Sequence, residues 1–230
     1  MSVNDLVLVQ GMSDTRRALA RWNREPGILA PWLSLSVGIA AALLCAVYVV
    51  AKVSTPDSTP FLIAGFHSPA SLDDYLAVLY RNSLVLALHA MACVAGFIAG
   101  SSLPLSAAKR HGLSRFVHEK AGPLAIGFVI CATGFSLTTQ AYLIGSGVAT
   151  VSHELHITPG LLLLALLPHA LPELTALFLP LAAWIIASRH DRWDELLAAT
   201  FVTVAVAVPV LLASAAVELW VSPRLLQLLT

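Results

Sequence analysis

Two ionisable residues in a proline-rich apolar run are the strongest candidates for chemistry in this chain. His169 and Glu173 occur in the run LPHALPEL, residues 167–174. Their i, i+4 spacing places them on one face of a helix. A histidine can donate a ring proton to a carboxylate, which fixes its tautomer. The pattern fits a buried His–Glu pair that fixes helix packing, and it also fits a proton, metal or substrate site.

The prolines around this pair predict an irregular helix. Pro168 and Pro172 each remove a backbone donor and clash with the preceding turn, so we expect a kink near His169. Irregular backbone at membrane depth is tolerated only where it is packed in protein or lines a cavity. Both arguments predict that His169 and Glu173 face inward.

Two further polar residues could complete a site with this pair. Asn82 and His89 are seven residues apart and share a helical face. Because polar groups are costly in lipid, we expect Asn82, His89, His169 and Glu173 to form one cluster, with His89 the better partner and Asn82 the weaker. No metal or other cofactor is expected: the HExxH spacing is absent, and zinc would need His89 to join His169 and Glu173.

Other positions in the apolar segments indicate helix packing. Gly96 and Gly100 form a GxxxG pair, which lets another helix approach closely. Gln140 is expected to hydrogen-bond between helices. Glu218, near the end of the last apolar run, either turns inward to accept hydrogen bonds or extends into the headgroups.

The composition explains why these residues must be positioned by membrane helices. Of 230 residues, 58% are hydrophobic and 11% are charged, whereas a soluble domain has about 45–50% and about 25%. This excludes a disordered chain and favours an integral membrane protein whose first partner is the lipid bilayer. Thirteen basic residues balance thirteen acidic ones, so no nucleic-acid partner is expected.

Five segments are long and apolar enough to cross a bilayer, which takes about 20 residues. We therefore predict an all-α polytopic bundle of five transmembrane helices, the fourth kinked by proline. The predicted spans are residues 32–51, 83–108, 123–147, 160–187 and 199–220.

Loop charge predicts the orientation. Ten basic residues fall in 1–31, 109–122 and 188–198, and three fall on the opposite side. The N-terminus is therefore expected in the cytoplasm and the C-terminus outside, in the plasma membrane. The chain divides into a cytoplasmic tail, 1–31, which alternatively forms an interfacial helix, and a transmembrane domain, 32–230, with an outer segment, 52–82.

The outer segment has two notable features. Ser71 is expected to cap a helix that either lies on the membrane surface or continues into the second span. Phe61, Leu62, Ile63 and Phe66 are unusually apolar for a loop, which indicates contact with lipid or a partner.

These features together resemble the stage II sporulation protein M family, from about Tyr80 to Leu228. The matching parts are Asn82, Gly96 and Gly100, a turn at Gly145, the motif formed by Pro168, His169 and Glu173, and the exit LLASAAVELWVSP at 211–223. The resemblance implies five spans with the N-terminus inside. It also implies a bacterial inner-membrane protein, because in spore formers this family anchors cell-wall hydrolases during engulfment.

The expected function is therefore a non-enzymatic membrane scaffold that recruits cell-wall or other envelope proteins outside the cytoplasm; homo-oligomerisation is left open. The alternative is a small transporter or channel-like protein, which the broken fourth helix suggests. A third and weaker alternative is an intramembrane metal-dependent hydrolase built on the His/Glu site.

Overall fold

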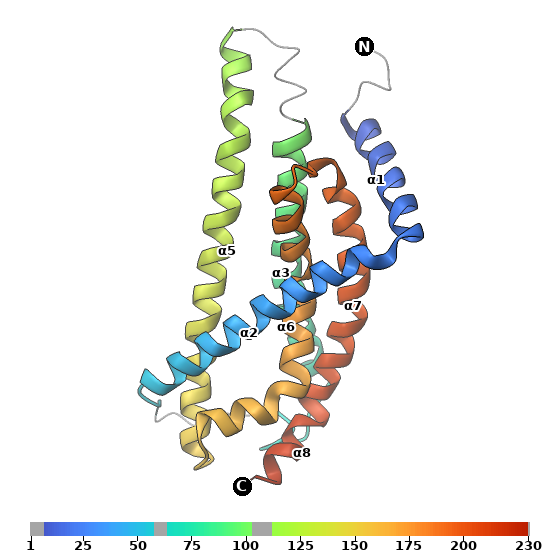
Figure 1. Cartoon of the computed structure of the whole chain (residues 1–230). Helices are drawn as coiled ribbons and strands as arrows, with labels where there is room; N and C mark the ends of the chain where they lie inside the picture. Colours follow the sequence, from blue (N-terminus) through green and yellow to red (C-terminus); the bar gives the residue numbers. More distant parts are fainter. Residues whose placement is uncertain (1–6, 58–63, 103–111, 230) are drawn as a thin grey trace. The chain divides into compact units, whose positions relative to one another are not determined.

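The computed structural model describes residues 7–57, 64–102 and 112–229, and this part of the chain is all-α (Figure 1). An isolated bridge joins Ala64 and Ser68, and no strand is present among these residues. The helices are α1 (Val7–Arg24), α2 (Leu29–Val53), α3 (Leu72–Phe97), α5 (Gly112–Glu154), α6 (Pro159–Arg189), α7 (Leu196–Trp220) and α8 (Ser222–Gln227), with short 3-10 turns at Pro26–Ile28 and Trp193–Glu195 and a π-helical turn, η3, at Ile98–Ser102.

Five of the described helices are long and apolar enough to cross a membrane. They are α2, α3 with its π-helical extension, α5, α6 and α7, and they correspond to the five predicted spans. The predicted all-α helical bundle is therefore confirmed, and the protein is a multi-pass membrane protein.

The start of α3 is set by a reciprocal cap. The Ser71 hydroxyl accepts from the Asp74 backbone N–H at 3.2 Å, while the Asp74 carboxylate accepts from the Ser71 hydroxyl and backbone N–H. This capping box satisfies orphan donors of the first turn. From Leu72 the helix continues without a break to Phe97, so the helix expected after Ser71 and the second span are one element.

Helix α6 tolerates its internal prolines. It is helical over 31 residues, Pro159–Arg189, and Figure 1 shows it bending within its first half. Pro168 and Pro172 are exposed on this helix whereas His169 is buried. The prolines therefore lie away from the face that packs, and the chain bends instead of breaking.

Helix α5 is longer than the sequence predicted. Its 43 residues span about 64 Å at 1.5 Å per residue, twice the roughly 30 Å hydrocarbon core. The expected turn at Gly145 is wrong, because α5 continues to Glu154. A Cβ at Gly145 would lie 2.6 Å from the Val50 side chain and 2.9 Å from the Val47 carbonyl oxygen, so this glycine serves close packing on α2.

Two compact units divide the chain, and the five long helices each contribute residues to both. Unit 1 comprises residues 1–36, 86–133 and 178–206, and unit 2 comprises residues 37–85, 134–177 and 207–230. Of the predicted basic loop 109–122, residues 109–111 lie outside the described residues, as does 103–108 of the second predicted span; from Gly112 the chain is helical.

Unit 1 is organised around α1, which is a packed helix. Trp22 is buried and meets Trp32 edge-on, with ring centroids 5.2 Å apart. Arg21 forms an ion pair with Glu195, which is buried in the turn between α6 and α7. The remaining buried members of this core are Ala18, Leu179, Ala183, Ala198 and Ala199.

The GxxxG pair of unit 1 packs against tryptophans. A Cβ at Gly96 would lie 2.6 Å from Trp184 Nε1 and 2.8 Å from Leu196 Cδ1, and one at Gly100 would overlap the Trp193 ring. Small residues at these positions let the end of α3 approach α6 and the turn that follows it.

Unit 2 is organised around the turn at residues 64–68. Gly65 has a φ of +83°, and a Cβ there would lie 2.7 Å from Pro223 Cγ. Tyr75 donates from its hydroxyl to the Leu212 carbonyl oxygen at 3.1 Å, and its ring lies 5.6 Å from that of Trp220. The turn and the start of α3 thus close on the junction of α7 and α8. Residues 61–63 of the apolar outer stretch lie outside the described residues.

Contacts within each unit show which segments at the ends of the long helices lie close together. In unit 1, Arg21 binds Glu195, so α1 lies with the α6–α7 turn. In unit 2, His67 Nε2 lies 3.8 Å from Glu154 Oε1, so the turn 64–68 lies with the end of α5. Both pairings agree with an alternating path of five spans.

Substitution of Gly96 tests the packing of α3. Gly96→Ala should destabilise the protein by about 1–3 kcal/mol, because the added methyl group overpacks the Trp184 contact. Gly127→Ala on α5 is the matched control, since nothing lies within 4 Å of its Cβ position. That variant should be stabilised by about 0.5–1 kcal/mol through helix propensity.

Thermal unfolding in detergent compares the two variants. Equal melting temperatures for Gly96→Ala and Gly127→Ala would contradict the close approach at Gly96.

Candidate functional site

The centre of the candidate site is a hydrogen bond between two buried side chains of unit 2. His169 Nδ1 lies 2.7 Å from Ser222 Oγ, and the tautomer of the ring decides which of them donates. His169 is 8% exposed and Ser222 is 2% exposed. Ser222 is the first residue of α8, so the bond ties α6 to the junction of α7 and α8.

One turn further along α6, Glu173 faces Asn82 of α3. The Asn82 amide is the hydrogen-bonding neighbour of the Glu173 carboxyl group. The pair falls short of a formed hydrogen bond, because Asn82 Nδ2 and Glu173 Oε2 are both buried without a partner within 3.5 Å.

Two charged residues complete the surroundings of Glu173. Glu218 of α7 and Arg81 of α3 both act electrostatically on the Glu173 carboxyl group. Arg81 is also the charged neighbour of Glu218. Glu218 is half-buried, while Arg81 is exposed. A guanidinium beside two carboxyl groups offsets their mutual repulsion.

The arrangement joins four helices, α3, α6, α7 and α8, through polar side chains. We name Arg81, Asn82, His169, Glu173, Glu218 and Ser222 the α6 polar cluster; all six belong to unit 2. Buried polar groups must be paired by protein when water is absent. Each member therefore constrains how α3, α6 and α7 rotate about their own axes.

His89 has a different described neighbour. It belongs to unit 1, whereas Asn82, His169 and Glu173 belong to unit 2. Its ring is fully buried and meets Phe178 edge-on, with centroids 5.3 Å apart. The neighbours that the structure gives for Glu173 and His169 are Asn82, Arg81, Glu218 and Ser222.

The remaining predicted positions serve packing in different ways. Gly96 and Gly100 receive tryptophan rings, as described above. Gln140 donates from Nε2 to Ser136 Oγ at 3.0 Å; this bond lies within α5, so it does not link two helices. Pro168 and Pro172 occupy the exposed face of α6.

The cluster does not have the composition of a metal centre. Within the described ranges, no group of three or more histidine, cysteine, aspartate or glutamate residues could hold a metal ion. His169 and Glu173 share a face of α6, but His169 uses its Nδ1 atom on Ser222. The interactions that the structure gives for these side chains are hydrogen bonding and charge pairing.

Sequence reasoning missed the roles of Ser222 and Arg81. Ser222 belongs to the Ser-Pro pair that follows α7. In the sequence this pair indicates the end of a helix, but it does not indicate which residue Ser222 contacts. Arg81 precedes Asn82 directly, so an apolar stretch flanked by an Arg-Asn pair was the available signal. Neither signal identifies α6 as the helix that Ser222 and Arg81 face.

Comparison with protein-family models, with curated proteins and with solved structures found no match for this chain. The resemblance to the stage II sporulation protein M family therefore stays a sequence-based expectation.

The bond between His169 and Ser222 can be measured with a double-mutant cycle. His169→Ala and Ser222→Ala should each lower the free energy of unfolding by about 1–3 kcal/mol, because each leaves a buried polar atom unpaired. The double variant should cost clearly less than the sum of the two.

A matched control pairs Ser222→Ala with Thr138→Ala, whose hydroxyl donates to Gly134 within α5. Those two costs should simply add. Additive costs for the His169–Ser222 pair as well would show that this bond is not formed in the bilayer.

The role of Arg81 is tested by its dependence on Glu173. Arg81→Gln should lower the melting temperature by about 2–4 °C, which corresponds to about 1 kcal/mol for a chain of this size. In a Glu173→Gln background the same change should have a smaller effect, because one of the two carboxylates is then neutral. An equal loss in both backgrounds, measured by thermal unfolding, would contradict the proximity of Arg81 to Glu173.

Proposed function

We propose that this protein is an integral membrane scaffold that anchors envelope or cell-wall proteins on the extracytoplasmic side of the plasma membrane. The observation that carries the proposal is the hydrogen bond between buried His169 and Ser222. Through this bond the histidine links two helices. A buried side chain that links helices stabilises the surface that these helices form.

The surface that this tie would hold is the outer side of unit 2. The turn 64–68 closes on Pro223 at Gly65, and Tyr75 bonds to the Leu212 carbonyl oxygen. His67 and Glu154 bring the end of α5 to the same turn. A rigid outer face loses little entropy when a partner binds, which is the advantage of a preorganised docking surface.

The orientation belongs to the proposal. With the N-terminus in the cytoplasm, the basic α1 and the α6–α7 turn lie inside, as the positive-inside rule requires. The turn 64–68 and α8 then face the extracytoplasmic space, where cell-wall and other envelope proteins are found.

Photo-crosslinking in living cells tests the scaffold. A photoreactive amino acid in place of the exposed Ser68 should give adducts with an exported protein, identified by mass spectrometry. The same amino acid in place of Asp194, exposed in the α6–α7 turn, is the control and should give no adduct with exported proteins.

Ser222→Ala tests whether the adduct depends on the cluster. Because this change should loosen the outer face, the yield of the Ser68 adduct should fall several-fold when variant and wild-type protein are present at equal levels. Adducts with exported proteins at Asp194, or none at Ser68, would contradict the proposal.

A proton or cation transporter is the second candidate, and one observation favours it. Glu173 and Glu218 lie within electrostatic reach of one another beside Arg81, and Glu173 Oε2 and Asn82 Nδ2 are buried without hydrogen bonds. Intramembrane carboxyl groups in pairs are typical of proton relays.

Flux assays separate the two candidates. Under the scaffold proposal, proteoliposomes that contain the protein should conduct protons and sodium ions no faster than protein-free vesicles. A flux that Glu173→Gln abolishes, and that Gly127→Ala leaves unchanged, would favour transport over the scaffold.

A further inference from the structure

A pocket in unit 1 has the features of a lipid site, and none of its lining residues belongs to the α6 polar cluster. Its volume is about 220 Å³, which is less than the roughly 300–1,000 Å³ of sites that enclose a whole small molecule. It is lined by five apolar residues and one amide: Leu19, Trp22, Asn23, Ile28, Leu29 and Val202.

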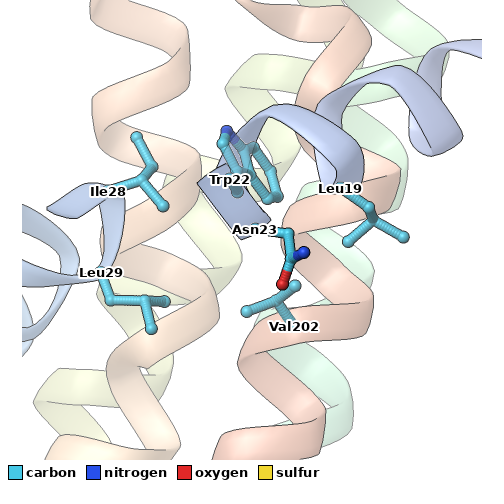
Figure 2. Close-up of a pocket in the computed structure, with 6 residues that line it drawn as sticks. All are labelled: Leu19, Trp22, Asn23, Ile28, Leu29 and Val202. Carbon is cyan, nitrogen blue, oxygen red and sulfur yellow. The ribbon is translucent and has the colours of Figure 1, made fainter. Parts of the chain in front are cut away.

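The walls of the pocket lie where the basic helix α1 meets the start of the apolar span α2. Leu19, Trp22 and Asn23 come from the last turns of α1, Ile28 from the turn that follows, and Val202 from α7. Figure 2 shows Ile28 and Leu29 on one side, and Trp22, Asn23 and Val202 on the other. Leu29 is the first residue of the apolar span α2, so the apolar material available at this depth is lipid.

One lining residue lacks a polar partner. Trp22 is 7% exposed, and its Nε1–H is buried with no hydrogen-bond acceptor among the residues that the structure describes. A buried donor without an acceptor is costly. Tryptophan is typical of the interface because its N–H reaches lipid carbonyl groups while its ring stays in apolar surroundings.

The charge around the pocket indicates the headgroup. Residues 7–28 contain Arg16, Arg17, Arg21 and Arg24 against two acids, Asp14 and Glu25. Asp14 is paired with Arg17, and Arg21 is paired with Glu195. Arg24 is exposed and directly follows Asn23, so a guanidinium lies next in sequence to the one polar wall of the pocket. Basic residues near a membrane surface attract anionic lipids.

We propose that this pocket holds a segment of one acyl chain of an anionic phospholipid, whose phosphate meets the arginine-bearing end of α1. The lipid would fasten α1 to α2 and α7, whose residues line the pocket. This inference does not depend on the scaffold function, because a transporter could bind the same lipid.

Native mass spectrometry of the full-length protein, extracted from membranes in mild detergent, tests the proposal. The wild-type protein should retain one phospholipid. Leu29→Trp, which fills the pocket, should lower the lipid-bound fraction about tenfold, equivalent to about 1.4 kcal/mol of binding. Leu33→Trp is the matched control one turn along α2; Leu33 is 41% exposed and does not line the pocket, so this variant should retain the lipid.

Two further measurements keep the test decisive. Val202→Phe fills the pocket from α7 and should reproduce the loss if Leu29→Trp does not fold. Titration with phosphatidylglycerol and phosphatidylcholine should show a preference for the anionic lipid in wild type and a several-fold smaller preference in Arg24→Gln.

Three outcomes would overturn the proposal. They are retention of lipid by both pocket-filling variants, a wild-type protein that carries detergent alone, and an anionic preference that Arg24→Gln leaves unchanged.

Discussion

The cost of a polar group that is buried away from water constrains this protein more than any other interaction. In a bilayer, a side chain such as His169 cannot turn to solvent, so protein must supply its partner. Ser222 supplies it at 2.7 Å, and this one bond fixes the junction of α7 and α8 on α6. Arg81, Asn82 and Glu218 then surround Glu173 one turn away. The rotation of three helices follows from these pairings.

Much of the fold could be predicted because each membrane helix can be recognised from the residues of its own segment. Length and hydropathy identified five spans, and the capping pattern at Ser71 identified the start of α3. His169 and Glu173, at i and i+4, lie in one continuous helix, α6. The small residues Gly96 and Gly100 correctly indicated close approach, although their neighbours are Trp184 and Trp193.

Pairings between helices could not be predicted in the same way. A pattern along one helix gives its faces, but the rotation and depth of the neighbouring helix decide which residues meet. For this reason Ser222 and Arg81 were missed. That His89 joins this site stays a prediction; the ring contact that the structure gives for it is with Phe178. The turn expected at Gly145 was wrong for a related reason, because a glycine that ends a helix and one that admits a neighbouring helix look alike in sequence.

The central claim is that the α6 polar cluster is a packed structural tie, and water-edited solid-state NMR of the histidine-labelled protein in bilayers tests it most directly. Transfer of magnetisation from water to the His169 ring, assigned through its loss in His169→Gln, should be slow. The exposed His153 at the end of α5 should respond fast and serves as the internal reference. Transfer to His169 as fast as to His153 would mean that water reaches the cluster, and it would contradict the structural tie and favour a conducting path.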